Sequence, residues 1–218
     1  MISKILPKIY RISDHSNSYI VEFEKHITII DSGMDKKAKE LIKIIESIGK
    51  KPKAVLITHA HIDHINGLAK LKEKYKDIEV VSSEKDKHII ENGKIPLPKG
   101  IGGFFFKIML FFIGYKKVKV DKTFKNRYDD FKVIKTPGHT EGSVSLLFKK
   151  ILFCGDLIIN SKKIILPPNE FNLDEKKILN SIKKISKLDF NLILPGHGNF
   201  IKNGKKKLLL FLENSKNN

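Results

Sequence analysis

Four short apolar runs in this sequence each end at a turn that carries histidine or aspartate. Apolar runs of this length, bounded by turn residues, are typical of buried strands. Any fold for this chain must therefore accommodate imidazoles and carboxylates at the ends of several strands. The four turns are THAHIDH at 58–64, TPGHT at 136–140, GD at 155–156 and PGHG at 195–198.

Strand-like and helix-like segments alternate along the rest of the chain. The first three strands, expected over 8–12, 18–23 and 27–30, predict an antiparallel meander. Two sheets packed face to face, with helices on both outer faces, would bury this order of elements. We therefore predict an α/β (α+β) fold, a four-layer αββα sandwich. Later strands are expected over 54–57, 78–81, 131–135, 144–148, 151–154 and 191–194, and helices from Lys36 to Gly49, over 68–75 and 83–92, from Asn172 and around 208–212.

The length of 218 residues suits one substantial core, so we predict a single domain over 1–218 with an apolar insertion at about 93–117. A polar tail is expected from Glu213 to Asn218. Cys154 is the single cysteine, which gives no basis for a disulfide framework. The first seven residues lack the features of a secretory signal. We therefore predict a cytoplasmic protein.

The chain is strongly basic, with 42 Lys and Arg against 24 Asp and Glu and a net charge of +18. Such a charge can attract nucleic acid, anionic membranes or acidic substrates. Arginine, which is suited to bidentate contacts with phosphates and guanines, occurs only as Arg11 and Arg127. The composition therefore leaves a nucleic-acid partner open without favouring it, and a small-molecule substrate is the preferred expectation.

The segment 58–64 has the residue types of a metal site. A loop that leaves a strand can direct His59 and His61 one way and Asp63 and His64 another, so one loop could serve two cations. Imidazole nitrogens and carboxylate oxygens are ligands that zinc accepts in this mixture. The alternative is a polar helix N-terminus, with Asp63 as its cap and the histidines incidental.

The three later turns add further candidate ligands. Pro-Gly turns can present His139 and His197 at a sheet edge, although a single turn histidine is often merely exposed. Asp156 follows a buried-looking strand, where a carboxylate needs a cation or a lysine as partner. Cys154 is either a thiolate ligand or a small buried hydrophobe, and we favour the hydrophobe.

Taken together and in this order, HxHxDH, TPGHT, FCGD and PGHG resemble the metallo-β-lactamase superfamily over nearly the whole chain. The resemblance implies two divalent metal ions, zinc first, with iron or manganese as alternatives. By position, Asp156 would bridge the two ions, and Asp31, in the segment IIDSG, would form hydrogen bonds around the ligand loop. The first ion would be held by His59, His61 and His139, and the second by Asp63, His64 and His197.

TPGHT together with FCGD is most similar to the glyoxalase II-like thioesterase branch. About twenty residues follow Gly198, which is too few for the helical glutathione-binding extension of glyoxalase II. We therefore expect a hydroxyacylglutathione hydrolase-like enzyme that lacks this extension and hydrolyses a thioester, another ester or a lactone. Two cations would lower the pKa of a shared water and make a bridging hydroxide the nucleophile, with Asp63 and Asp156 as catalytic carboxylates.

The insertion contains the aromatic run Phe104, Phe105 and Phe106 between glycines. It is shorter than the roughly 20 residues of a membrane-spanning helix, so we predict no transmembrane segment. It could line an apolar substrate pocket as a lid, form a homodimer contact, lie on a membrane surface or pack as a core hairpin. We assign the three phenylalanines to substrate binding.

Three other functions stay open. An RNA- or DNA-processing phosphodiesterase of the same superfamily would suit the charge, and a mononuclear iron oxygenase could use similar ligands. A non-catalytic metal-binding module is the third, although structural zinc sites are closed four-ligand cages. His15, His26 and His88 lack neighbouring ligand residues and are expected at the surface.

Overall fold

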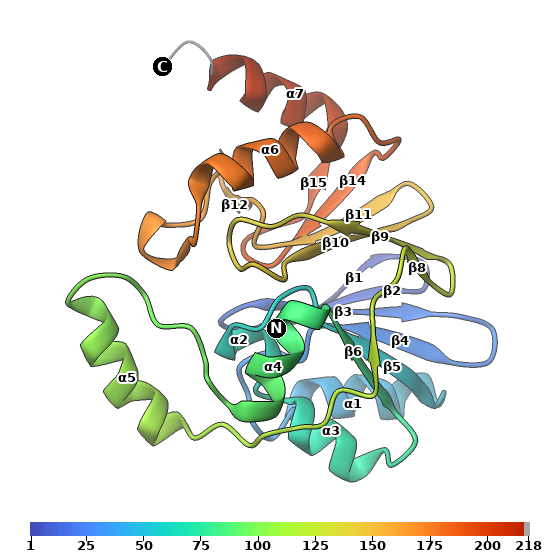
Figure 1. Ribbon diagram of the computed structural model, residues 1–218. Helices are drawn as coiled ribbons and strands as arrows, with labels where there is room; N and C mark the ends of the chain where they lie inside the picture. Colours follow the sequence, from blue (N-terminus) through green and yellow to red (C-terminus); the bar gives the residue numbers. More distant parts are fainter. Residues whose placement is uncertain (216–218) are drawn as a thin grey trace. The chain divides into compact units, whose positions relative to one another are not determined.

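The computed structural model describes residues 1–215, and the chain divides into two compact units, Met1–Thr123 and Phe124–Asn218 (Figure 1). Each unit contains a large sheet and its own helices, so the predicted mixed α/β fold with two sheets is confirmed. Residues 216–218 of the predicted polar tail lie outside the described residues. The single-domain assignment stays a prediction.

The first unit is built on a seven-stranded sheet with the order β1-β2-β3-β4-β5-β6-β7. Strands β1 to β4 pair antiparallel, which confirms the predicted meander, and β4 to β7 pair parallel. The strands are β1 (Ile2–Leu6), β2 (Ile9–Ser13), β3 (Asn17–Glu22), β4 (Ile27–Ile30), β5 (Pro52–Leu56), β6 (Glu79–Ser82) and β7 (Lys122–Thr123).

Two helices cover one face of this sheet. Helix α1 (Lys39–Ile48) and helix α3 (Leu68–Lys74) contribute leucines and isoleucines to a core shared with alternate residues of the strands, among them Ile29, Val55 and Val80. The period-2 alternation of a strand and the apolar stripe of a helix meet in this core. The remaining helices of the unit are α2 (Ile62–Ile65), α4 (Glu84–Asn92) and α5 (Gly102–Ile113).

The second unit is built on a six-stranded sheet with the order β15-β14-β11-β10-β9-β8. Strand β14 runs parallel to β11, and the other pairs are antiparallel. The strands are β8 (Arg127–Tyr128), β9 (Phe131–Lys135), β10 (Val144–Phe148), β11 (Ile151–Gly155), β14 (Leu192–Pro195) and β15 (Ile201–Lys202).

Helix α6 (Glu175–Ile185) packs Ile178, Ile182 and Ile185 into the core of the second unit, and helix α7 (Gly204–Asn214) adds Leu208. A separate hairpin is formed by β12 (Ile159–Ser161) and β13 (Lys163–Ile165), and a short 3₁₀ helix spans Asn169–Phe171. In this unit too, one sheet face is covered by amphipathic helices.

Several predicted boundaries were wrong. Strand β1 was not predicted. Helix α1 starts at Lys39 rather than Lys36 because the carboxylate of Asp35 accepts the backbone N–H groups of residues 37 and 39 and forms a turn there. Helix α6 starts after Asp174, whose side chain caps it, and not at Asn172. Helix α7 continues through Asn214, so the predicted tail is helical at its start.

The insertion is not a core hairpin. It forms helix α5, in which Gly103 is the buried residue, so its apolar side chains do not enter the core. Across residues 1–215 no helix has the length and apolar character to cross a membrane. The physical reason for the wrong alternative is that hydrophobicity alone does not say whether a segment packs inward.

Candidate metal centre

In the first unit, three parallel strands deliver polar residues to one edge of the sheet. Ile30 pairs with Leu56, and Leu56 pairs with Val81, so β4, β5 and β6 end side by side. The next residues along each strand are Asp31, the segment 58–64 and Ser83, which caps α4. The carboxyl ends of adjacent parallel strands are where α/β proteins place ligands. The sheet thus gathers the first group of predicted residues.

Asp31 is buried and organises the ligand loop. Its Oδ1 accepts the backbone N–H of Thr58 at 2.7 Å, and its Oδ2 accepts the Thr58 hydroxyl at 2.7 Å. The same Oδ2 lies 2.9 Å from Nδ1 of His64. Asp31 adopts a left-handed backbone with φ 56°, which turns the chain sharply after β4. One carboxylate therefore fixes the start of the loop and an imidazole near its end.

These hydrogen bonds decide which ring nitrogen is available to a cation. A carboxylate oxygen only accepts, so Nδ1 of His64 carries the proton and Nε2 has the lone pair. The Thr58 hydroxyl gives its one proton to Asp31, and it therefore accepts from Nδ1 of His59 at 3.1 Å. Both buried histidines thus have Nε2 available to a cation, as do metal-binding histidines that are oriented by a hydrogen bond at Nδ1.

The other loop residues lie close by. The rings of His59 and His61 are 4.9 Å apart, and those of His59 and His64 are 4.1 Å apart. Oδ2 of Asp63 is 3.5 Å from Nε2 of His64, and this carboxylate is 23% exposed. The buried Asp86 accepts the backbone N–H of Ala60 at 3.0 Å, which holds the loop from the side of α4.

In the second unit, two adjacent parallel strands present Asp156 and His197. Gly155 at the end of β11 pairs with Pro195 at the end of β14, and the N–H of Gly196 donates to the carbonyl of Gly155 at 2.8 Å. Gly198, with φ 83°, passes so close to Asn160 that a Cβ there would lie 2.1 Å from its carbonyl oxygen. A residue with a side chain would therefore not fit at position 198 without a shift of the backbone.

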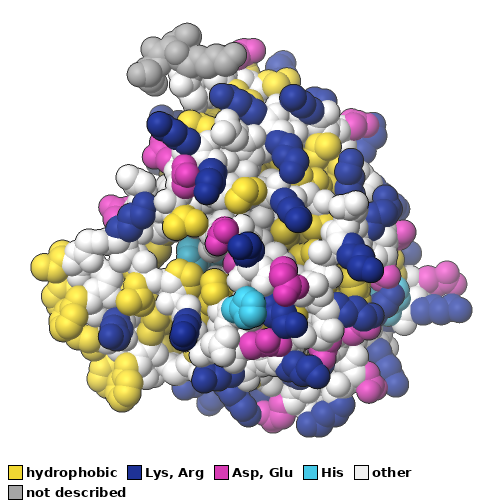
Figure 2. Space-filling view, in the orientation of Figure 1, with side chains coloured by type: hydrophobic (Ala, Val, Ile, Leu, Met, Phe, Trp, Pro, Cys, Tyr) yellow, Lys and Arg dark blue, Asp and Glu magenta, His cyan; other side chains and the backbone are white. Residues whose placement is uncertain are grey.

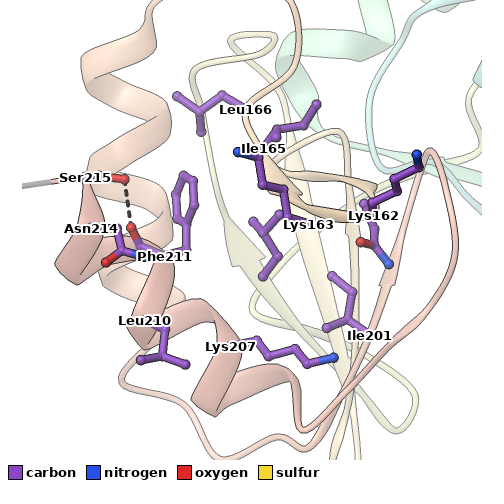
Figure 3. A pocket seen from close by; sticks show the side chains of 12 residues that line it. Lys162, Lys163, Ile165, Leu166, Ile201, Lys207, Leu210, Phe211, Asn214 and Ser215 are labelled. Atoms are coloured by element: carbon purple, nitrogen blue, oxygen red, sulfur yellow. Dashed lines mark hydrogen bonds between the residues drawn. The ribbon is translucent and has the colours of Figure 1, made fainter. Parts of the chain in front are cut away.

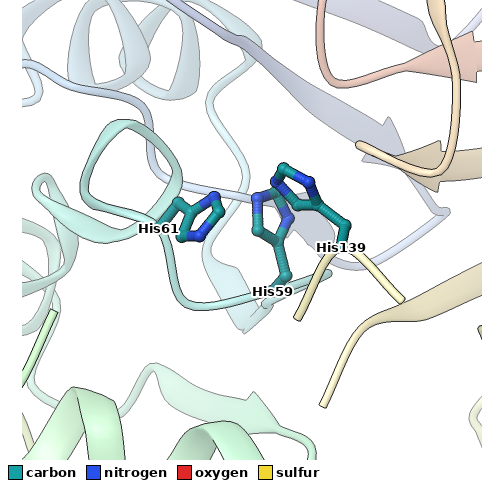
Figure 4. Close-up of side chains that lie close together, drawn as sticks. All are labelled: His59, His61 and His139. Carbon is teal, nitrogen blue, oxygen red and sulfur yellow. The ribbon is translucent and has the colours of Figure 1, made fainter. Parts of the chain in front are cut away.

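His139 stands on the turn after β9, and Asn172 orients it. Nδ1 of His139 donates to Oδ1 of Asn172 at 2.9 Å, while the Asn172 amide donates to the carbonyl of Pro167. Gly138 adopts φ 139° and passes against Ile178 of α6, where a Cβ would lie 2.4 Å from the backbone nitrogen. His139 is thus held with Nε2 available to a cation, as His59 and His64 are. Figure 4 shows His59 and His61 on the loop after β5, and His139 on its turn.

Two histidines converge on one oxygen of Asp156. Nε2 of His139 is 3.5 Å from Oδ2, and Nε2 of His197 is 3.2 Å from the same atom. Charge-assisted hydrogen bonds are shorter, at about 2.7–2.9 Å. Two ligands that each lie about 2.1 Å from a tetrahedral cation are about 3.4 Å apart. The imidazole and carboxylate donors and their spacing therefore fit a divalent transition metal.

Comparison with known proteins identifies the family. The model of the metallo-beta-lactamase superfamily matches residues 12–197. The chain belongs to the metallo-β-lactamase superfamily. Its match to the superfamily runs from β2 to the PGHG turn and so contains all of the predicted ligands.

Named relatives of this superfamily member include the probable metallo-hydrolase YybB of Bacillus subtilis, which is 30% identical over 84% of this chain and 80% of that protein. The hydroxyacylglutathione hydrolase GloC of Haemophilus influenzae is 28% identical over 87% of this chain and 88% of its own length. Among solved structures, the BLEG-1 B3 metallo-beta-lactamase has a TM-score of 0.69 and 25% identity, covering 91% of this chain and 95% of that one.

The predicted ligands lie on two sets of turns. The loop after β5 carries His59, His61, Asp63 and His64, and Asp31 lies beside it. The turns of the second sheet carry His139, Asp156 and His197. All seven side chains could hold a metal ion. Asp63 does not cap a helix, since it lies within α2, whose N-cap is His61. Phe104, Phe105 and Phe106 lie on α5.

Cys154 is buried in the core of the second unit, and burial, followed by the charge of Asp156, raises the pKa of its thiol. Its interpretation as a small hydrophobe is therefore confirmed. His15 and His88 are exposed as predicted, while His26 is half-buried and stacks on Phe23 with ring centroids 4.8 Å apart.

Three functional residues were missed by sequence reasoning. Thr58, Asp86 and Asn172 each hold a ligand or its loop by a hydrogen bond. Thr58 lies two residues after the end of β5, and Asp86 lies in the first turn of α4, which follows β6. Polar residues at these positions, close to the carboxyl ends of parallel strands, could have signalled them. Asn172 lies 33 residues from His139, and no local pattern connects the two.

The second unit also has a surface hollow of about 610 Å³ between the hairpin β12–β13 and helix α7 (Figure 3). Lys162, Lys163 and Lys207 line it together with apolar side chains such as Phe211. None of the predicted ligands lines this hollow. It is therefore distinct from the turns that carry His139, Asp156 and His197.

Proposed function

We propose that this chain is a metal-dependent hydrolase that cleaves a thioester, another ester or a lactone. The family assignment and the printed names of two relatives, a probable metallo-hydrolase and a hydroxyacylglutathione hydrolase, support the hydrolase. In the proposal two divalent cations, zinc or else iron or manganese, are bound by the seven ligands predicted from the sequence.

The observation that carries this proposal is the shared oxygen of Asp156. A carboxylate oxygen within 3.5 Å of two imidazole Nε2 atoms, on a side chain that is 7% exposed, is suited to bridge two cations. As a structural ion pair the same group would be costly, since buried charges need close and complete pairing. Metal binding accounts for both the burial and the spacing.

When bound, the cations would supply Lewis acidity and lower the pKa of water toward about 7. Asp63 is the partly exposed carboxylate of the set, so it can accept a proton from water and release it to solvent. Asp31 and Asn172 hold two imidazoles in the tautomer that binds through Nε2. These positioning residues keep the ligands in place while the acyl group is attacked.

The preference for an acyl substrate is supported by the name of GloC, and the assignment of Phe104, Phe105 and Phe106 to its apolar portion stays a prediction. Deleting this aromatic run should raise KM for long acyl thioesters and leave KM for acetyl thioesters unchanged. An equal change for both lengths would remove the three residues from the substrate site.

The test combines metal analysis with four probes: a thioester, a lactone, a β-lactam and a phosphodiester. We expect about two metal ions per chain and hydrolysis of the thioester or lactone. Asp156→Asn should lose metal and at least about a hundredfold in kcat/KM, while the control Asp189→Asn, at an aspartate 78% exposed, should behave as wild type. Full metal content and activity in Asp156→Asn would refute the proposal.

The net charge of +18 favours one second candidate, a phosphodiesterase acting on RNA or DNA. In that case only the phosphodiester probe would be cleaved, and the rate would fall as salt is added because contacts with phosphates are screened. Iron as the bound metal, together with oxygen consumption instead of hydrolysis, would identify an oxygenase.

A further inference from the structure

Helix α5 exposes an unusually apolar face. Five of the 14 phenylalanines of the chain lie in this helix, and Phe104 and Phe111 are 64% and 82% exposed. Figure 2 shows hydrophobic side chains gathered over α5. Exposed aromatic clusters of this kind mark interaction sites on proteins. The exposed large residues of the helix are Phe104, Phe105, Ile108, Met109, Phe111 and Phe112.

The exposed residues form one continuous arc. At about 100° per residue, the six side chains span about 160° of the helix surface. Phe106, Leu110 and Ile113, which are half-buried, lie on the opposite side. The helix therefore has one apolar side that is half-buried and a second apolar side that is open to solvent.

The ends of the insertion are anchored while its helix projects. Ile95 and Tyr115 pack against the core of the first unit, and the Tyr115 hydroxyl donates to the carbonyl of Ile90 at 3.0 Å. Nζ of Lys36 lies 3.4 Å from the carbonyl of Ile113 and can donate to this C-terminal end of α5. The segment that carries the exposed arc is thus attached to the first unit on both sides of α5.

The charged side chains within the insertion have one sign. Between Glu91 and Asp121 the sequence contains six lysines and no acidic residue, and all six are exposed. The two flanking acids are engaged elsewhere, since Glu91 accepts the N–H of Val120 and Asp121 accepts Lys72. The lysines are Lys94, Lys99, Lys107, Lys116, Lys117 and Lys119.

We propose that α5 docks on an anionic phospholipid membrane, with its exposed phenylalanines inserted at the level of the acyl chains and the surrounding lysines on the lipid headgroups. A helix of this length lies in the interface and does not span it. Membrane binding by such a helix combines burial of apolar area with attraction of lysines to anionic lipid. Charge complementarity selects the lipid surface over a second copy of this chain, which would bring its own six lysines.

The first experiment measures sedimentation with vesicles of phosphatidylcholine alone and with 30% phosphatidylglycerol. We expect binding to the anionic vesicles, at least about tenfold weaker binding to neutral ones, and loss of binding with added salt. Phe104→Ser, Phe111→Ser and Phe112→Ser combined should abolish binding. The matched control replaces Leu173, Leu209 and Leu210, which are also exposed, with serine and should bind as wild type.

The lysines are tested in the same way. Lys94→Gln, Lys107→Gln and Lys117→Gln combined should reduce binding to anionic vesicles about tenfold or more. The control exchanges three exposed lysines of the second unit, Lys176, Lys183 and Lys206, and should have little effect. Thermal unfolding followed by circular dichroism establishes that each variant is folded.

A direct reading of insertion is available because the chain has no tryptophan. The emission of Phe111→Trp should shift to the blue on anionic vesicles and be quenched by brominated acyl chains, while Leu210→Trp should show neither change.

Absence of vesicle binding overturns the proposal, as does equal binding to neutral and anionic vesicles. Formation of a dimer that the triple serine variant abolishes, without vesicle binding, would assign the face to a second copy. Asp156→Asn should still bind vesicles, so this test is independent of the metal centre.

Discussion

Thr58 occupies a central place among the side chains of the ligand loop. Its backbone and its hydroxyl both donate to Asp31, and the hydroxyl accepts from His59. Asp31 in turn accepts from His64. Two candidate ligands are therefore oriented through one hydroxyl and one carboxylate, neither of which has to touch a metal.

Replacing Thr58 with valine removes the hydroxyl but keeps the shape of the side chain. We expect metal affinity to fall by about 10- to 100-fold, because His59 loses the acceptor that fixes its Nδ1 proton. Thr58→Ser keeps the hydroxyl and should retain wild-type affinity. Competition with a chromophoric chelator measures both constants. Equal affinities for the two variants would show that the hydroxyl does not position the ring.

Gly138 gives a prediction about the turn that carries His139. In Gly138→Ala the new Cβ would meet the backbone of α6 at 2.4 Å, and φ 139° is unfavourable for alanine. We expect destabilisation by about 2 kcal/mol or more. In Gly102→Ala the Cβ meets nothing within 4 Å and the helix gains propensity, so this control should be neutral or stabilising. Urea unfolding compares the two.

Among the elements, the strand β3 is joined to the loop before β5 by an ion pair. Nζ of Lys50 lies 2.7 Å from Oε1 of Glu22, and this hydrogen bond is the main cause that lowers the pKa of Glu22. A lowered carboxyl pKa means that the pair stabilises the fold above the unfolded pKa and is lost as the pH falls through the folded pKa.

Glu22→Gln should therefore be less stable than wild type at pH 7, by less than about 1 kcal/mol because the pair is partly exposed to solvent. The difference should begin to shrink as the pH falls below about 4.5, the ordinary pKa of the carboxyl, and should be lost once the pH has passed the lowered pKa of the folded protein. Urea unfolding at pH 7 and pH 3.5 measures it, with the exposed Glu24→Gln as control. A difference that grows toward acid pH would contradict the assignment.

For the whole molecule, bound metal and folding should be linked. A ligand that binds the folded state raises the midpoint of thermal unfolding in proportion to the logarithm of its excess over Kd. We expect chelation to lower Tm in wild type and to have little effect in Asp156→Asn. An unchanged wild-type Tm after complete metal removal would disprove the linkage.

Much of the fold could be predicted because periodicity reports burial directly. The strands β4, β9 and β10 were predicted with their observed bounds, since each is a short segment rich in apolar residues and bounded by turn residues. The N-cap of α4 at Ser83 was also predicted, because capping depends on residues near each other in the sequence. The start of α1 was not predicted, because it depends on a turn that the side chain of Asp35 forms.

For the candidate site, residue type and position after strands were enough to select side chains that could hold a metal ion, but not most of the residues that orient them. Asp31 was found through the resemblance of its turn. Asn172 contacts His139 because α6 packs beside the turn, and that contact depends on tertiary structure. The exposure of the apolar side chains of α5 could not be predicted either, since an apolar sequence does not reveal whether its side chains are buried or face solvent.

The anchoring of the insertion by Ile95 and Tyr115 has a consequence for how such proteins diverge. Because these two residues contact the core on either side of α5, we expect the stretch between them to tolerate replacement without repacking of the sheet. Membrane association could then be gained or lost among relatives while the metal-binding residues are retained.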